Sequence, residues 1–154
     1  MEILSYIIGI IIIFAAVIAG MFLGLIAKEE LKPGKKYILL LHYILLAIIL
    51  VLSVYFFESN MLSIFFAAMV LYLFIFKFSF NDIIIYCVFG IIYFLSFNTN
   101  SIIPLASLML LYGFPVGSLL VEANPKAKLP FLIKKIIIRY IWIIPIAIIL
   151  FLVI

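Results

Sequence analysis

Six long apolar segments, separated by short polar stretches, make up this chain. The apolar residues form unbroken runs and do not alternate with polar ones, a pattern that disfavours a transmembrane barrel and favours helices. A helix needs about 20 mostly apolar residues to cross a bilayer, within a range of about 17–25. The pattern therefore predicts a single all-α domain, an integral membrane bundle with spans near 3–27, 37–57, 61–78, 82–99, 102–121 and 134–154.

Local features qualify individual segments. The two shortest, 61–78 and 82–99, can form a re-entrant hairpin, but their combined length suffices for two crossings, which we favour. The first segment exceeds the roughly 7–15 apolar residues of a signal peptide and lacks a cationic flank, so we predict a retained span. In the last two segments, Pro115 and Pro145 predict kinks.

Composition supports a bilayer as the surrounding solvent. Hydrophobic residues make up 71% of the 154 residues and charged residues 10%, against roughly 45–50% and about 25% in soluble domains. A soluble domain of this size cannot hide so much apolar surface. The net charge of +4 comes from cations beside apolar segments, a topological pattern that argues against nucleic acid as a partner. We expect a multi-pass protein of the cell membrane.

The cations also indicate an orientation. In the six-span arrangement all ten fall on one side, and the other side carries none. The positive-inside rule places the cationic side in the cytoplasm and both termini on the non-cytoplasmic side. Five or seven spans would scatter these charges, so the pattern also supports six. The cations are Lys28, Lys32, Lys35, Lys36, Lys77, Lys126, Lys128, Lys134, Lys135 and Arg139.

Small residues recur four apart in the first and fifth segments. Ala16, Gly20 and Gly24 form one stripe, and Gly113 and Gly117 form another. In lipid, such stripes let two helix backbones approach closely. Glycine is also frequent in membrane helices without that role. We favour a helix–helix contact, either within the protein or with a partner subunit.

The same two segments carry a faint internal repeat. In both copies, two glycines, a glutamate and a lysine are separated by the same numbers of residues. Each copy leads from its apolar segment into a polar stretch. Such spacing is found in parallel repeats of helical hairpins, but few other positions match, so we interpret it as coincidence. The copies are Gly20, Gly24, Glu29 and Lys35, then Gly113, Gly117, Glu122 and Lys128.

Ionisable residues inside membranes are candidates for function. His42, the only histidine, lies five residues into the second segment, and Arg139 lies at similar depth in the last. The simpler interpretations are a hydrogen-bonded histidine and an arginine that reaches the headgroups. The alternative pairs Arg139 with Glu29, Glu30 or Glu122. We therefore note a possible polar site made of His42, Arg139, Glu29 and Glu122.

Signals for catalysis, metals or cofactors are missing from the sequence. It contains no His, Cys, Asp and Glu set with metal-ligand spacing and no glycine-rich phosphate loop. Nothing places a nucleophile beside the single histidine, and the single cysteine, Cys87, cannot form an internal disulfide. All six acidic residues lie at the ends of segments or between them, so none marks an ion pathway. We predict no enzymatic activity and no cofactor.

The junction from Ile26 to Tyr37, IAKEELKPGKKY, resembles a loop of small archaeal membrane proteins. The nearest family is the accessory membrane subunits of archaeal energy-converting hydrogenase complexes, which are similar in size and hydropathy. The resemblance implies metal clusters and ion-translocating carboxylates on other subunits, and it assigns no functional residue here. We expect a non-catalytic structural or accessory subunit with other membrane subunits as partners.

Two other classes stay open, each with its own structural requirement. A small-solute transporter or substrate-binding membrane component requires a polar-lined cavity between helices, whereas an accessory subunit requires an exposed face suited to partner helices. A membrane-embedded enzyme acting on lipid requires polar side chains clustered near one interface, with His42, Glu29, Glu30 and Arg139 as candidates.

Overall fold

Helices account for nearly all of the chain that the structure describes. The computed structural model describes residues 2–57, 82–97 and 101–153, and within these ranges it contains helices and connecting turns but no strand. The predicted all-α class is confirmed, and the predicted segment 61–78 lies outside the described residues. The helices are α1 (Glu2–Ile26), α2 (Lys28–Phe56), α4 (Asp82–Phe97), α5 (Ile102–Glu122), α6 (Leu129–Tyr140) and α7 (Ile143–Val153).

Four helical segments in the described ranges are long and apolar enough to cross a bilayer. They are α1, α2, α5 and the combined α6–α7 segment. Helix α4 is apolar but has only 16 residues, which extend about 24 Å against a hydrocarbon core of about 30 Å. The described part of the chain therefore contains four to five helices suited to a membrane, and the count of six stays a prediction.

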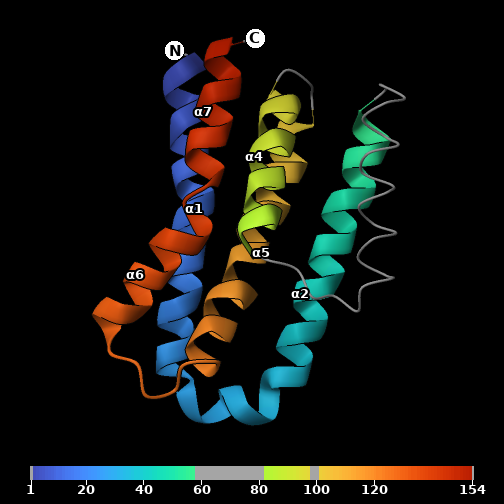
Figure 1. Ribbon diagram of the computed structural model, residues 1–154. Helices are drawn as coiled ribbons and strands as arrows, with labels where there is room; N and C mark the ends of the chain where they lie inside the picture. Colours follow the sequence, from blue (N-terminus) through green and yellow to red (C-terminus); the bar gives the residue numbers. More distant parts are fainter. Residues whose placement is uncertain (1, 58–81, 98–100, 154) are drawn as a thin grey trace.

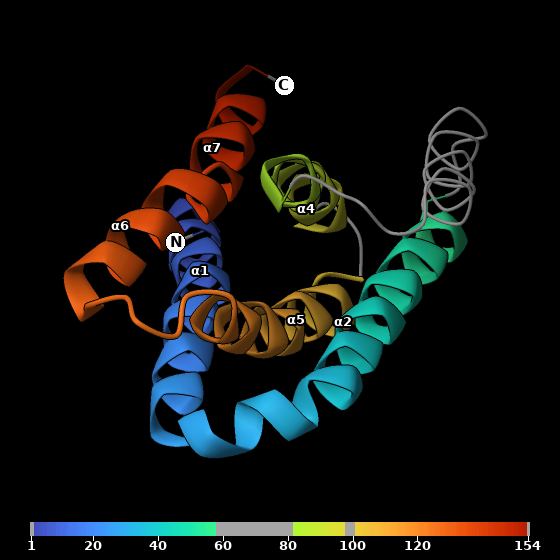
Figure 2. The same cartoon turned by 60° about the horizontal axis from the view of Figure 1, so that its bottom comes forward.

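The long helices stand side by side in a curved row (Figures 1 and 2). The row runs from α6–α7 through α1 and α5 to α2, and α4 packs inside the curve against α7 and α5. Both ends of the chain lie at one end of the bundle, whereas the α1–α2 junction and the connection from α5 to α6 lie at the other (Figure 1). The two lysine-bearing connections therefore share one end of the bundle.

Helices α1 and α5 run in the same direction and form the central pair. Among the described helices, α2 follows α1 in sequence but packs mainly against α5, and α7 comes after α5 but packs against α4 and α1. Each hairpin thus places its second helix beside the first helix of the other hairpin. The two copies of the repeat that we interpreted as coincidence fall on these equivalent helices and the polar stretches that follow them.

Helix α2 begins before its apolar segment because the preceding polar stretch is itself helical. Its first turn carries Glu29 and Glu30, whose negative charge is favourable at a helix N-terminus. Pro33 lies inside the helix and lacks the N–H that would bond to the preceding turn. The helix changes direction along this part (Figure 1). The stretch predicted to be a polar loop is therefore a helical corner.

The last apolar segment begins at Leu129 and is broken between α6 and α7. Pro145 has no N–H to donate to the carbonyl of Ile141, four residues earlier. That carbonyl instead accepts a 2.9 Å hydrogen bond from the Ile144 N–H. The tighter turn ends α6, so the kink predicted at Pro145 is present as a break. Helix α5, in contrast, continues through Pro115.

An aromatic cluster joins three helices near the chain termini. The ring of Tyr6 on α1 packs 4.7–5.0 Å from the rings of Tyr93, Phe97 and Phe151. The Tyr6 hydroxyl donates to the carbonyl of Ala147 at 2.9 Å, and the Tyr93 hydroxyl donates to the carbonyl of Tyr6 at 3.1 Å. These buried bonds tie α1, α4 and α7 together.

Candidate functional site

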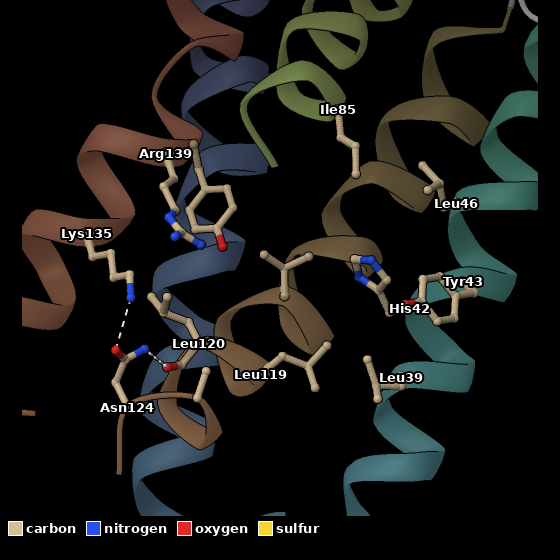
Figure 3. Close-up of a pocket in the computed structure, with 13 residues that line it drawn as sticks. Leu39, His42, Tyr43, Leu46, Ile85, Leu119, Leu120, Asn124, Lys135 and Arg139 are labelled. Carbon is tan, nitrogen blue, oxygen red and sulfur yellow. Dashed lines mark hydrogen bonds between the residues drawn. The ribbon is translucent and has the colours of Figure 1, made fainter. Parts of the chain in front are cut away.

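A pocket of about 240 Å³ lies between α2, α5 and α6, with the start of α4 above it (Figure 3). Its α2 residues fall between Leu39 and Leu46, and its α5 side runs from Val116 to Asn124. The pocket is therefore nearer the lysine-bearing end of the bundle. Leucines and other apolar side chains form much of the wall, and the polar lining residues are His42, Tyr43, Asn124, Lys135, Arg139 and Tyr140.

Helix α6 supplies positive charge to this pocket through Lys135 and Arg139. The two residues are four apart, so they share one face of the helix. In Figure 3, the guanidinium of Arg139 points from α6 toward the pocket. The Lys135 ammonium donates a 3.0 Å hydrogen bond to Oδ1 of Asn124, and Nδ2 of Asn124 donates to the carbonyl of Leu120 at 2.7 Å. Asn124 therefore fixes the position of the ammonium group.

The two glutamates of the predicted polar site, Glu29 and Glu122, do not line the pocket. Glu122 forms an ion pair with Lys35, at 2.9 Å, and Glu29 is exposed in the first turn of α2. The described lining residues include two cations but no Asp or Glu. Of the four residues in the possible polar site, the structure brings His42 and Arg139 to one pocket and places the two glutamates outside its lining.

His42 lies on the α2 wall of the pocket, opposite α6 (Figure 3). Its Nε2 is 3.3 Å from the hydroxyl of Tyr112, and the two ring centroids are 4.7 Å apart. The ring of Tyr43 contacts the imidazole edge-on, with a centroid distance of 5.1 Å. These contacts hold the imidazole in a defined orientation beside the pocket.

Packed aromatic rings lie beside the pocket on the side toward the middle of the bundle, and one of them, Tyr140, lines it. Tyr86 packs against Phe89, Tyr112 and Tyr140, with centroid distances of 4.9–6.2 Å. Phe89 also contacts Tyr112 edge-on at 5.0 Å. These four side chains are at most 2% exposed. Among the described residues, this aromatic layer separates the pocket from the cluster around Tyr6.

The small-residue stripes meet at the contact between α1 and α5. A Cβ atom added to Gly20 would lie 2.7 Å from Cα of Phe114, and one added to Gly113 would lie 2.8 Å from Cβ of Ala16. A Cβ atom at Gly117 would lie 2.7 Å from the carbonyl carbon of Gly20. Real Cβ atoms essentially never come within 3.0 Å of another heavy atom. The two backbones are therefore too close for larger side chains at the three glycines.

The same contact continues toward the lysine-bearing end. A Cβ atom at Gly24 would lie 3.0 Å from Cα of Ser118. The hydroxyl of Ser118 donates a 3.0 Å hydrogen bond to the carbonyl of Gly20 on the neighbouring helix. The five small residues singled out in the sequence thus meet within the chain.

Several lining residues were missed by reasoning from the sequence. Tyr43, Asn124 and Tyr140 carry no distinguishing motif, and Lys135 was assigned to the topological charge pattern. The spacing of Lys135 and Arg139 on one helix face is the signal that could have revealed the pair. In the described ranges, no group of three or more His, Cys, Asp and Glu side chains is placed to hold a metal ion.

Comparisons of the chain with models of protein families, with curated proteins and with solved structures each find no match. The resemblance of residues 26–37 to accessory subunits of hydrogenase complexes therefore stays a prediction from the sequence. The pocket has to be interpreted from its own geometry and chemistry.

Proposed function

We propose that this chain is a multi-pass membrane protein that binds a small polar ligand in the pocket between α2, α5 and α6. Its apolar helices suit a membrane location. The observation that carries the proposal is the group of six polar side chains around a volume of about 240 Å³. A polar-lined cavity favours the substrate-binding alternative over the accessory subunit predicted from the sequence, because an accessory subunit does not require such a cavity.

The packed rings beside the pocket support binding over conduction. A path for ions needs stabilising groups along its whole length. The buried rings of Tyr86, Phe89 and Tyr112 instead pack against one another next to the pocket, toward the middle of the bundle.

The chemistry of the wall supports binding without a reaction. The described lining residues include no Ser, Cys, Asp or Glu. The contact of His42 with the hydroxyl of Tyr112 gives the wall a polar group of defined position.

A pocket-filling substitution tests the proposal. Thermal unfolding of the protein in nanodiscs would be followed with phosphate, succinate, an amino acid, a sugar and a polyamine, because a ligand that binds only the folded state stabilises it. We expect at least one solute to stabilise the wild type and Leu111→Trp, whose side chain is exposed on α5. Leu119→Trp, which puts a bulkier side chain into the pocket wall, should no longer be stabilised by the solute. No stabilisation by any solute class would overturn the proposal.

A second measurement separates binding from transport. The protein reconstituted alone into liposomes should hold a proton or sodium gradient as well as empty liposomes do. A faster collapse that His42→Ala abolishes would replace the binding role with an ion pathway through the bundle.

A further inference from the structure

We propose that the outer surface of α6 binds an anionic phospholipid, with the headgroup at Lys134 and an acyl chain along the isoleucines beside it. This surface lies outside the lining of the pocket between α2, α5 and α6, so lipid binding here does not depend on the proposed function. Three features support it: an open apolar groove, the charge of the surrounding chain, and the place of α6 at the edge of the bundle.

Helix α6 has one buried strip and two different flanks. Leu132, Ile136 and Tyr140 form the buried strip and are at most 2% exposed. One flank faces the pocket through Lys135. The other flank is an open groove of about 430 Å³ that is apolar except for one lysine. Its lining residues all belong to α6 and are Leu129, Pro130, Ile133, Lys134, Ile137 and Ile138.

The charge of this part of the chain favours an anionic partner. Residues 123–154 contain four lysines and no Asp or Glu. Lys134 is exposed and is the lysine that lines the groove, whereas the Lys135 ammonium donates its hydrogen bond to Asn124 beside the pocket. A headgroup with net negative charge therefore complements the groove, and a zwitterionic headgroup does so less well.

The position of α6 suits contact with lipid near the headgroups. In both views α6 lies at the outer edge of the bundle and begins at the lysine-bearing end (Figures 1 and 2). Lys134 lies five residues past Leu129, hence about 7–8 Å along the helix. A lysine at this depth reaches the headgroups while its methylene stem stays on apolar surface. Ile137 and Ile138 follow one turn farther from that end, where they can contact the acyl chain.

Trp142 extends the apolar surface just beyond the end of α6. It is 45% exposed, and its indole N–H donates a 3.1 Å hydrogen bond to the carbonyl of Ile138. Tryptophan is enriched where the hydrocarbon meets the headgroups. Because the chain contains a single tryptophan, its fluorescence reports on lipid beside this groove.

Quenching of Trp142 fluorescence by brominated lipid tests the proposal. The full chain is reconstituted into phosphatidylcholine vesicles that contain a minor fraction of lipid with brominated acyl chains, either phosphatidylglycerol or phosphatidylcholine. We expect phosphatidylglycerol to occupy the site with about five-fold higher affinity, the effect of one lysine beside an anionic headgroup. Lys134→Gln should reduce this preference to less than about two-fold, and Lys134→Arg should keep it because the charge remains.

Lys36→Gln is the matched control for Lys134→Gln. Lys36 is exposed near the lysine-bearing end of the bundle, but on α2, at the far end of the row from α6 (Figure 2). Its replacement removes the same charge and leaves the groove unchanged, so the preference for phosphatidylglycerol should stay at its wild-type value. Each variant is first checked for an unchanged melting temperature.

Three outcomes would overturn the proposal. Equal affinity of the wild type for the two brominated lipids would mean that the groove holds ordinary bilayer lipid. An equal loss of preference in Lys36→Gln and Lys134→Gln would mean that the lysine-bearing end as a whole attracts the lipid. No quenching by either lipid would mean that the outer surface of α6 does not contact lipid.

Discussion

Replacing Gly20 with leucine should separate the two central helices. The hydrogen atom of Gly20 faces the backbone of α5 at Phe114 and Gly113. Backbone atoms cannot move aside by changing a rotamer, unlike the end of a flexible side chain. A leucine at this position must therefore push α1 and α5 apart along their contact.

The size of the effect follows from the geometry. The first added atom would collide with the carbonyl oxygen of Phe114 and would lie 2.7 Å from its Cα, whereas ordinary contact begins at 3.4 Å, so the helices must separate locally by at least 0.7 Å. A gap of roughly 0.5–1 Å removes a quarter to a half of the dispersion energy of the atoms concerned. The separation also weakens the hydrogen bond from Ser118 to Gly20. Overpacking and the weakened interhelical bond together should lower the free energy of unfolding by about 2–4 kcal/mol.

Unfolding in mixed detergent micelles, followed by far-ultraviolet circular dichroism, measures this change. Ala15→Leu is the matched control, because Ala15 is exposed on the same helix and its substitution should change stability by no more than about 0.5 kcal/mol. Gly34→Ala controls for loss of a glycine, since nothing lies within 4 Å of its added Cβ atom; it should be neutral or stabilising by about 0.5–1 kcal/mol. Equal stability of Gly20→Leu and Ala15→Leu would refute the packing argument.

Three further predictions concern other parts of the bundle. Gly9→Ala should lower the free energy of unfolding by about 1–3 kcal/mol, because the added Cβ atom collides with the Tyr93 hydroxyl. In a double-mutant cycle, adding Tyr93→Phe to the same chain should restore part of the lost stability. In a double-mutant cycle, Lys35 and Glu122 should show a coupling energy of at most about 1 kcal/mol that weakens with salt, because the lysine side chain is 47% exposed. A larger coupling energy that does not change with salt would contradict this prediction. A cysteine introduced at Gly34, with the native cysteine replaced by alanine, should react with an impermeant reagent only after permeabilisation, and labelling of intact cells would reverse the predicted orientation.

Much of the helical architecture could be predicted because it depends on local composition. Long apolar runs form helices in lipid, where each backbone group must bond within its own segment. Helix ends were less predictable, because polarity does not end a helix by itself. The stretch from Lys28 to Lys36 is polar yet helical, and the break at Ile141 depends on one missing donor at Pro145. Spacing of small residues indicated close contact, but not that α1 would meet α5.

The candidate site was harder to predict because its parts come from distant segments. His42 and Arg139 were separately recognisable as ionisable residues within apolar segments, but their common pocket depends on where α2 and α6 lie relative to α5. Lys135 matched the topological charge pattern so well that a second role was not apparent. Asn124 acquires its importance only through its hydrogen bond to that lysine. Packing between helices, rather than any local pattern, creates the site.

The crossed packing of the two hairpins has a consequence for biosynthesis. During synthesis α1 and α2 are made before α5, yet among the described helices α2 packs mainly against α5 and has little contact with α1. A nascent chain that ends before residue 102 therefore lacks α5, the described helix against which both of them pack most extensively. Helix α7, which packs against α4 and α1, is made last. The packing of the described helices is therefore completed late, after the final helices have been made, and not hairpin by hairpin as each emerges from the ribosome.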